Sequence, residues 1–247
     1  MESKINRYSK QLILINSLFI LVWLVISVFP FIWTFWGSFK VKADFFSRAD
    51  WMFAVTGVNT LIETGDTSTV KAYVESWTEG EFWKATMNTI IITVSVVTIS
   101  LFLGTLGAYA LSRSTYKYTF WILIAALIFR AMPHITLVSG YLFPFFQLNV
   151  WGILPTTIIV LVAINQPFTL WLLYSFFKTV PKELDESALI DGCSYFQAFR
   201  YVIMPVMWPG VVTAGLFSMM LAYNDFTVTS LLLNQQNYTM VPKINAY

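Results

Sequence analysis

Five long runs of apolar residues constrain this chain more than any other feature of its sequence. Each run exceeds the roughly 20 residues that a helix needs to cross a hydrocarbon core of about 30 Å. The chain is 57% hydrophobic and 11% charged, which leaves too few polar residues to cover a water-soluble protein of this length. The sequence therefore predicts an all-α, polytopic helical membrane protein with five visible spans. The predicted spans are residues 11–36, 85–111, 119–142, 152–177 and 206–233.

Basic residues in the loops indicate how these spans are oriented. Residues 1–10 are basic, but the apolar run after them is too long for a signal peptide and lacks a small-residue cleavage site. Cytoplasmic loops carry an excess of Lys and Arg, which places residues 1–10 and the loop 178–205 in the cytoplasm. The basic residues on that side are Lys4, Arg7, Lys10, Arg113, Lys117, Lys178, Lys182 and Arg200.

The segment 37–84 is predicted to be external, and its acidic residues outnumber its basic ones. Within it, residues 65–69 are typical of a turn and residues 70–77 of a short surface helix. Two interpretations stay open for this segment, contact with an external partner or a solvated connector. The aromatic content of 18% suits a protein whose Trp and Tyr side chains contact membrane lipid at the two interfaces.

Composition argues against several classes of function. A net charge of +2 with scattered basic residues gives no support for nucleic acid binding. The chain has one His and one Cys, so neither a metal site nor a nucleophilic centre is predicted. It has no glycine-rich loop of the kind that cradles phosphates. We therefore expect no cofactor in this chain and no enzymatic activity of its own.

The loop 178–205 is an island of charge between two apolar runs, and it begins like a helix. Pro181 suits a first helical position. Glu183, Asp185 and Glu186 give the first turns the negative charge that a helix N-terminus favours. Gly192 then predicts a left-handed cap at the end of this short helix.

A second helix is predicted directly after this turn. Ser194 opens it, and Gln197 completes a capping box three residues later. Pro205 is expected to end the helical pattern. We therefore predict a helix, a glycine turn and a second helix; an ordinary polar connector is the alternative. The apolar residues at helical spacing in the second helix are Phe196, Phe199, Val202 and Ile203.

The stretch Glu186-Ser-Ala-Leu-Ile-Asp-Gly192, with Phe199 and Ile203-Met-Pro205 beyond it, resembles the EAA loop of membrane subunits of binding-protein-dependent ABC importers. Ser187 and Cys193 stand where that family usually has Ala, and both are small. The resemblance implies that this loop is the coupling helix, seated in a groove of a cytoplasmic ATPase. The ATPase-coupling residues that it implies are Glu186, Ser187, Ala188, Asp191, Gly192 and Phe199.

The resemblance extends from about residue 83 to the end of the chain. The segments 230–233 and 237–239 are similar to the second membrane subunit of maltose-type importers, in the carbohydrate-uptake branch. The resemblance implies a MetI-like permease fold over residues 85–247, incomplete at its C-terminus, with a sixth span expected after the chain end. Further matching positions are Asn88-Thr89, Gly104 through Ala108-Tyr-Ala-Leu111, Met132-Pro133, Pro167 and Tyr223-Asn-Asp-Phe226.

The same resemblance implies an ATP-driven importer of a sugar or oligosaccharide in a bacterial or archaeal cytoplasmic membrane. The partners would be a second homologous permease subunit, two ABC ATPase subunits that bind ATP and Mg, and an extracytoplasmic solute-binding protein. Two alternatives stay open. In the first, the solute of the importer is glycerol phosphate or a polyamine. In the second, the chain is a secondary transporter; such transporters often have inverted repeats, and none is apparent here.

Polar residues inside the predicted spans are candidates for the solute path, because they are costly in a membrane. Arg130 and His134 are four residues apart and share a helix face. The alternative is that Arg130 and Asp225 pair with each other or with backbone carbonyls. By contrast, Gly104 and Gly107 predict close helix packing. The candidate path residues are Arg130, His134, Asn165, Gln166, Asn224 and Asp225.

The segment after the fifth predicted span is short, uncharged and rich in amides. In the resembling maltose-type subunit, this position holds a loop that reaches into the binding protein. Amide and phenol groups can replace the hydrogen bonds of sugar hydroxyls. Contact with the binding protein and a plain interfacial turn are therefore both open. The residues concerned are Gln235, Gln236, Asn237 and Tyr238.

Overall fold

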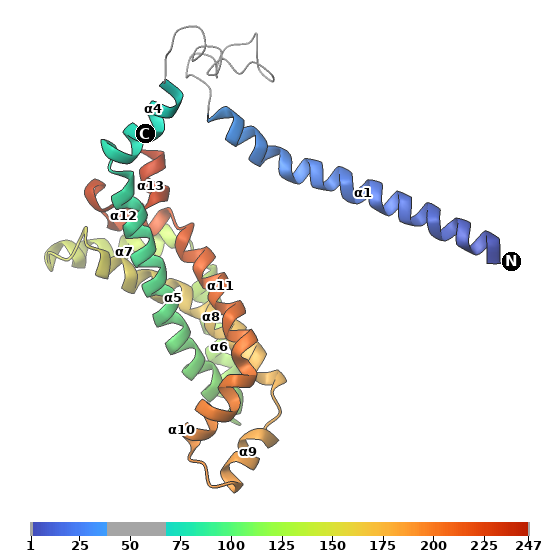
Figure 1. The fold of residues 1–247 in the computed structure, drawn as a ribbon. Coiled ribbons are helices and arrows are strands. Elements are labelled where there is room, and N and C mark those ends of the chain that lie inside the picture. The colour runs from blue at the N-terminus through green and yellow to red at the C-terminus, as the bar shows by residue number, and fades with distance from the viewer. Residues whose placement is uncertain (1, 39–67, 247) are drawn as a thin grey trace. The chain divides into compact units, whose positions relative to one another are not determined.

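The computed structural model describes residues 2–38 and 68–246. These residues are almost entirely helical, which confirms the predicted all-α fold (Figure 1). The chain divides into two compact units, Met1–Gly80 and Glu81–Tyr247.

The first unit contains one long helix, α1 (Glu2–Gly37), where the first span was predicted. Its apolar part, Leu12–Phe35, is long and apolar enough to cross a membrane. Pro30 lies inside the helix without ending it.

The segment 37–84 is described only in part. The short helix predicted at residues 70–77 is present as α4 (Ser68–Thr78). The turn predicted at residues 65–69 falls mostly outside the described residues.

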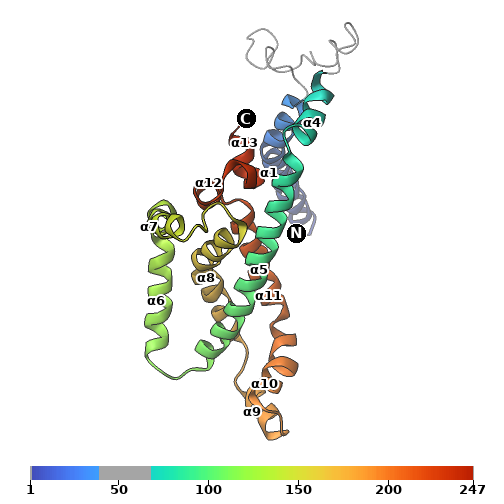
Figure 2. The ribbon, with the colours of Figure 1, turned by 90° about the vertical axis from the view of Figure 1, so that its left-hand side faces the viewer.

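The second unit is built around α5 (Phe82–Arg113), α8 (Leu154–Thr179) and α11 (Met204–Tyr223). These three helices pack against one another, and α6 (Tyr118–Ala131) packs against α8 (Figure 2). Among the described residues, four helices are long and apolar enough to cross a membrane, or five if one bent pair counts as a span. The count of five agrees with the five predicted spans, provided that the bent pair is one of them.

Small residues bring α5 and α8 close together, as predicted. A Cβ atom at Gly104 would lie 3.1 Å from Cγ2 of Thr169, and one at Gly107 would lie 3.2 Å from Cδ1 of Leu170. Two buried apolar clusters fill the spaces between the helices. One cluster includes Ile92, Val96, Val138, Leu161, Val228 and Leu232, and the other includes Ala108, Leu173, Phe177, Phe199, Ile203 and Met207.

The third predicted span, 119–142, is not one continuous helix. It consists of α6 and α7 (His134–Gln147), which are bent by 87° relative to each other. Met132 has the extended conformation that a following proline favours, with ψ of 141°, and Pro133 has no N–H to continue the helix. The carbonyl of Pro133 instead accepts the N–H of Thr136 at 3.0 Å and so starts α7.

The prediction that Pro205 ends its helix is wrong. The helix runs from Tyr195 to Tyr223 through α10 (Tyr195–Gln197), a π-helical segment η1 (Ala198–Ile203) and α11. The N–H of Met204 donates to the carbonyl of Phe199, five residues back. A π turn is wider than an α turn, so it accommodates the proline ring that follows.

The fifth predicted span also ends earlier than expected, at Tyr223 instead of residue 233. Short elements follow it: α12 (Thr227–Leu232), the 3-10 turn η2 (Gln235–Asn237) and α13 (Met240–Asn245). The carboxylate of Asp225 accepts the N–H groups at the start of α12 and so favours a new helix there. α12 packs against α7 and α8, whereas η2 and α13 pack against α5.

We predict that Gly210→Ala destabilises the protein. A Cβ atom at Gly210 would lie 2.8 Å from Cγ of Phe176 on α8, at the base of the ring. Overpacking of this kind costs about 1–3 kcal/mol. Gly140→Ala is the matched control, because a Cβ atom there meets nothing within 4 Å. Thermal unfolding in detergent should show a lower midpoint for Gly210→Ala alone; equal midpoints for the two variants would contradict the close α8–α11 approach.

Candidate functional site

The two helices of the loop 178–205 meet at a glycine turn. The first helix, α9 (Glu183–Ile190), is followed by Gly192 with a φ of 87°. The N–H of Gly192 donates to the carbonyl of Leu189 at 3.1 Å, and that of Cys193 to the carbonyl of Ala188 at 3.0 Å. These two bonds form a Schellman motif. The left-handed cap predicted at Gly192 is confirmed.

The second helix begins with the predicted capping box. The N–H of Gln197 donates to Oγ of Ser194 at 3.3 Å, and the N–H of Ser194 donates to Oε1 of Gln197 at 2.8 Å. Only Cys193 separates the glycine turn from this box. The connection between the two helices therefore has little freedom to bend.

The predicted coupling residues divide into a buried base and an exposed surface. Ala188 and Phe199 are buried, at 4% and 9% exposure, and Phe199 belongs to the apolar cluster that includes Phe177 of α8. The remaining predicted coupling residues are exposed and available to a partner; they are Glu186, Ser187, Asp191 and Gly192.

The loop lies at one end of the second unit, and large apolar side chains are exposed on it (Figure 1). Ile190, Tyr195 and Phe196 are 86%, 76% and 70% exposed, and we call them the apolar tip. Phe196 and Phe199 were noted as apolar residues at helical spacing, but only Phe199 is buried. The sequence signal for the tip was the presence of large apolar residues inside an island of charge.

The contact that holds α9 on the spans was not identified from the sequence. Nη2 of Arg113 lies 2.8 Å from Oδ2 of Asp185. The hydroxyl of Tyr109 donates to Oδ1 of the same carboxylate at 2.5 Å. Asp185 had been assigned only to the helix N-terminus and Arg113 only to the charge of the cytoplasmic side. The available signal was a basic residue in the last turn of a span.

Asn165 and Gln166 lie in the middle of α8, beside Pro167. Asn165 is 3% exposed, and its amide nitrogen has no hydrogen-bond partner in the described part of the chain. Nε2 of Gln166 donates weakly to the carbonyl of Ser100 at 3.5 Å. Both side chains thus project into protein, as polar groups within a span are expected to do.

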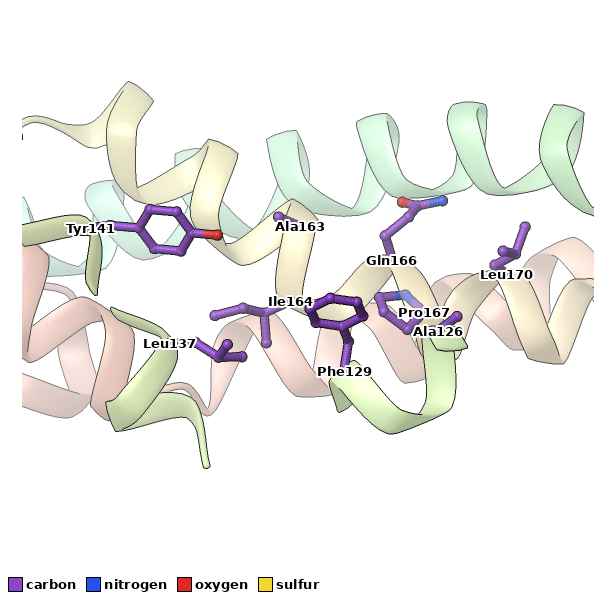
Figure 3. A pocket seen from close by; sticks show the side chains of 9 residues that line it. All are labelled: Ala126, Phe129, Leu137, Tyr141, Ala163, Ile164, Gln166, Pro167 and Leu170. Carbon is purple, nitrogen blue, oxygen red and sulfur yellow. The ribbon is translucent and has the colours of Figure 1, made fainter. Parts of the chain in front are cut away.

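A cavity of about 330 Å³ lies where α6 and α7 meet α8. Figure 3 shows its mainly apolar and aromatic lining, to which Tyr141 adds a hydroxyl; the amide of Gln166 points toward α5, where it donates to Ser100. Among the predicted path residues, Gln166 alone lines this cavity. The complete lining is Ala126, Phe129, Leu137, Tyr141, Ala163, Ile164, Gln166, Pro167 and Leu170.

Arg130, His134 and Asp225 lie at the other polar location. Nη1 of Arg130 is 2.8 Å from Nε2 of His134, which accepts because a guanidinium can only donate. Asp225 accepts N–H bonds from Val228 and Thr229 at 2.9 and 3.1 Å, and no Arg130–Asp225 ion pair occurs among residues 68–246. Asp225 lies in the turn beyond α11. Burial raises the pKa of its carboxyl above the usual value, and the two N–H bonds and the nearby Arg130 and His134 offset this rise only in part.

Asn224 lies in the same turn but is a helix cap. It is exposed, and its side chain donates to the carbonyl of Met220 at 2.9 Å. It follows the last residue of α11, so it does not lie within the span where it was predicted.

The segment predicted to contact a binding protein divides in two. Gln235 and Gln236 are exposed. The side chain of Asn237 instead donates to the carbonyl of Gly152 at 2.7 Å. Tyr238 packs against the buried cluster around Leu161. Only the two glutamines therefore have side chains that point away from internal contacts.

The sequence matches a known family over more than half of its length. The family model for the binding-protein-dependent transport system inner membrane component matches residues 97–247. The chain belongs to this family. It is thus a multi-pass inner membrane permease of an ABC importer. Permeases of this family act together with a partner permease, an ATPase and a substrate-binding protein, and the separate ATPase hydrolyses ATP.

Individual relatives agree with this membership. The permease is 31% identical to the trehalose/maltose transport system permease protein MalG of Thermococcus litoralis, over 88% of this chain and 74% of that protein. It is 29% identical to the diacetylchitobiose uptake system permease protein NgcG of Streptomyces coelicolor, over 94% of this chain and 74% of that protein.

A solved structure shows the same fold. It is a chain of a bacterial ABC transporter involved in the import of the acidic polysaccharide alginate, with a TM-score of 0.72. The match covers 94% of this permease and 77% of that chain, at 20% sequence identity. At that identity the likeness shows the fold alone, and the predicted MetI-like permease fold is confirmed.

Proposed function

We propose that this permease forms half of the pathway for a sugar or oligosaccharide in an ATP-driven importer. In this proposal it pairs with a second homologous permease, and two ATPase subunits bind ATP and Mg²⁺ at its cytoplasmic side. An extracytoplasmic binding protein delivers the solute. The N-terminus lies in the cytoplasm, on the same side as the loop 178–205. The sugar relatives support the solute class, and the distribution of basic residues supports the orientation.

The geometry of the loop 178–205 is the observation that carries the proposal. Its base is buried through Ala188 and Phe199, while Glu186 and the apolar tip are exposed at its end. An exposed apolar group beside a carboxylate suits a groove with apolar walls and a basic residue. The glycine turn and the capping box hold the two helices at a fixed angle. Such a loop can transmit a displacement, whereas a flexible one would absorb it.

The polar groups of the spans fit a neutral solute better than a phosphate. The cavity beside α8 offers a phenol and aromatic rings, groups that suit a sugar. A phosphate solute would need several basic groups facing the path, and Arg130 is already hydrogen-bonded to His134. We therefore favour a sugar over glycerol phosphate.

We predict that Glu186→Lys and Gly192→Pro leave the subunit in the membrane but uncouple or release the ATPase. The lysine would repel a basic residue in the proposed groove, and proline cannot adopt the positive φ of Gly192. Solute-stimulated ATP hydrolysis and co-purification of the ATPase measure the effect. If both survive in both variants, the coupling role of the loop is refuted.

We predict that Arg130→Ala lowers import several-fold or changes its selectivity while the ATPase still co-purifies. The change removes the charge at the α6–α7 bend and leaves His134 without its donor. Import should be measured relative to the amount of subunit in the membrane. A variant that fails to accumulate would assign Arg130 a structural role instead of a place in the path.

We propose that Gln235 and Gln236 contact the binding protein. Gln235→Ala combined with Gln236→Ala should slow import and weaken stimulation by the binding protein, with basal ATP hydrolysis unchanged. Asn237→Ala is the structural comparison, because it loses the bond to Gly152 and should cost about 1–2 kcal/mol of stability. Import at the normal rate in the glutamine variant would leave this segment a plain turn.

A further inference from the structure

Arg113, the last residue of α5, contacts two other elements of the second unit at once. Its Nη2 lies 2.8 Å from Oδ2 of Asp185 on α9. Its Nη1 donates to the carbonyls of Phe177 and Val180, at 3.2 and 3.1 Å, where α8 ends. The planar guanidinium presents its donors in a fixed fork, so its two hydrogen bonds at the end of α8 and its ion pair with α9 set the positions of these helices relative to α5.

Tyr109, one turn earlier on α5, completes this arrangement. Its hydroxyl donates to Oδ1 of Asp185, so both carboxylate oxygens are held. Its ring centroid lies 4.8 Å from that of Phe199 in η1 and 5.6 Å from that of Phe177 in α8. The guanidinium of Arg113 lies 5.7 Å from the same ring. Polar and aromatic contacts thus both join α5 to α8 and to the loop 178–205.

The ion pair is sheltered from water. The side chains of Arg113 and Asp185 are 16% and 15% exposed. Charges in such a position are screened less than surface charges. The last carbonyls of a helix lack partners within it and favour a cation. Loss of either charged partner would therefore leave the other poorly compensated.

The loop needs such a contact because α9 is short. A helix of eight residues is not stable in water by itself, so its direction must come from tertiary contacts. Ala188 supplies a small apolar contact, and Asp185 supplies the polar one. The neighbouring Glu186 is exposed on the surface proposed to meet the ATPase. The angle at which Glu186 is presented thus depends on how Asp185 is held.

We infer that Arg113, Tyr109 and Asp185 form a clamp that transmits displacement of the loop 178–205 to the spans α5 and α8. The inference rests on the proposed function, since the ATPase is what would move the loop. Arg113 is a positioning residue, because both of its terminal nitrogens are engaged with α8 and α9. Its contribution is to keep α9 and the ends of two spans in one rigid group.

The test uses Asp185→Asn in the importer assembled with its partner subunits. The substitution keeps the size of the side chain and removes its charge. We expect the ATPase to co-purify and ATP hydrolysis to continue, while import per ATP hydrolysed falls about tenfold, within the usual range for coupling between two sites. Arg113→Gln should act in the same direction, and the double variant should fall little further than Asp185→Asn alone, because both changes break one contact.

Matched controls separate the clamp from a general effect of charge. Glu183→Gln makes the same kind of change on the exposed surface of α9, and Lys117→Gln removes a base from the exposed loop after α5. Both should keep the normal ratio of import to hydrolysis. Tyr109→Phe removes one hydrogen bond but keeps the ring contacts, so its ratio should lie between those of the wild type and Asp185→Asn.

The inference is overturned if Asp185→Asn keeps the normal import per ATP, or if import and hydrolysis fall in parallel, as a purely structural role would cause. Hydrogen exchange of the α9 amides provides a readout that does not depend on the solute. Exchange should be faster in Asp185→Asn than in Glu183→Gln, and equal rates would also refute the clamp. Failure of the wild-type complex to bind an ATPase or import any sugar would instead refute the proposed function.

Discussion

The close packing of α5 against α8 is the contact on which the rest of the second unit depends. In a membrane there is little hydrophobic drive between helices, so van der Waals contact must hold them together. Gly104 and Gly107 allow this contact because their missing side chains leave room for Thr169 and Leu170. Once these two helices are fixed, so are their C-terminal ends, where Arg113 meets the carbonyls of Phe177 and Val180.

Local features of the loop were predictable because their bonds join residues that are close in sequence. The Schellman bonds at Gly192 and the capping box of Ser194 and Gln197 each involve residues within five positions of one another. The contact between Tyr109 and Asp185 joins residues 76 positions apart. No periodicity or propensity specifies such a pair, since it exists only after α5, α8 and α9 have packed.

Prolines show where sequence rules stop being sufficient. Pro133 was placed inside a continuous span, yet the chain bends by 87° there. Pro205 was expected to end a helix, yet the helix continues through a π-helical segment. Pro30 and Pro167 lie inside helices that continue on both sides. Each proline lacks the N–H that would bond to the carbonyl four residues before it. Whether the helix ends, bends or continues depends on which neighbouring group satisfies that carbonyl, and a single sequence does not identify this group.

The α5 helix links the two ends of the second unit physically. It has 32 residues without a proline, a length of about 48 Å at 1.5 Å per residue. Its C-terminal end contacts α9 through the Arg113 clamp. Near its N-terminal end, Asn88 donates to the carbonyl of Asn237 at 3.1 Å, and Thr89 accepts the N–H of Met240 at 2.9 Å. A displacement of α9 that preserves the clamp must move α5, and a continuous helix with contacts at both ends carries that movement to the segment proposed to meet the binding protein.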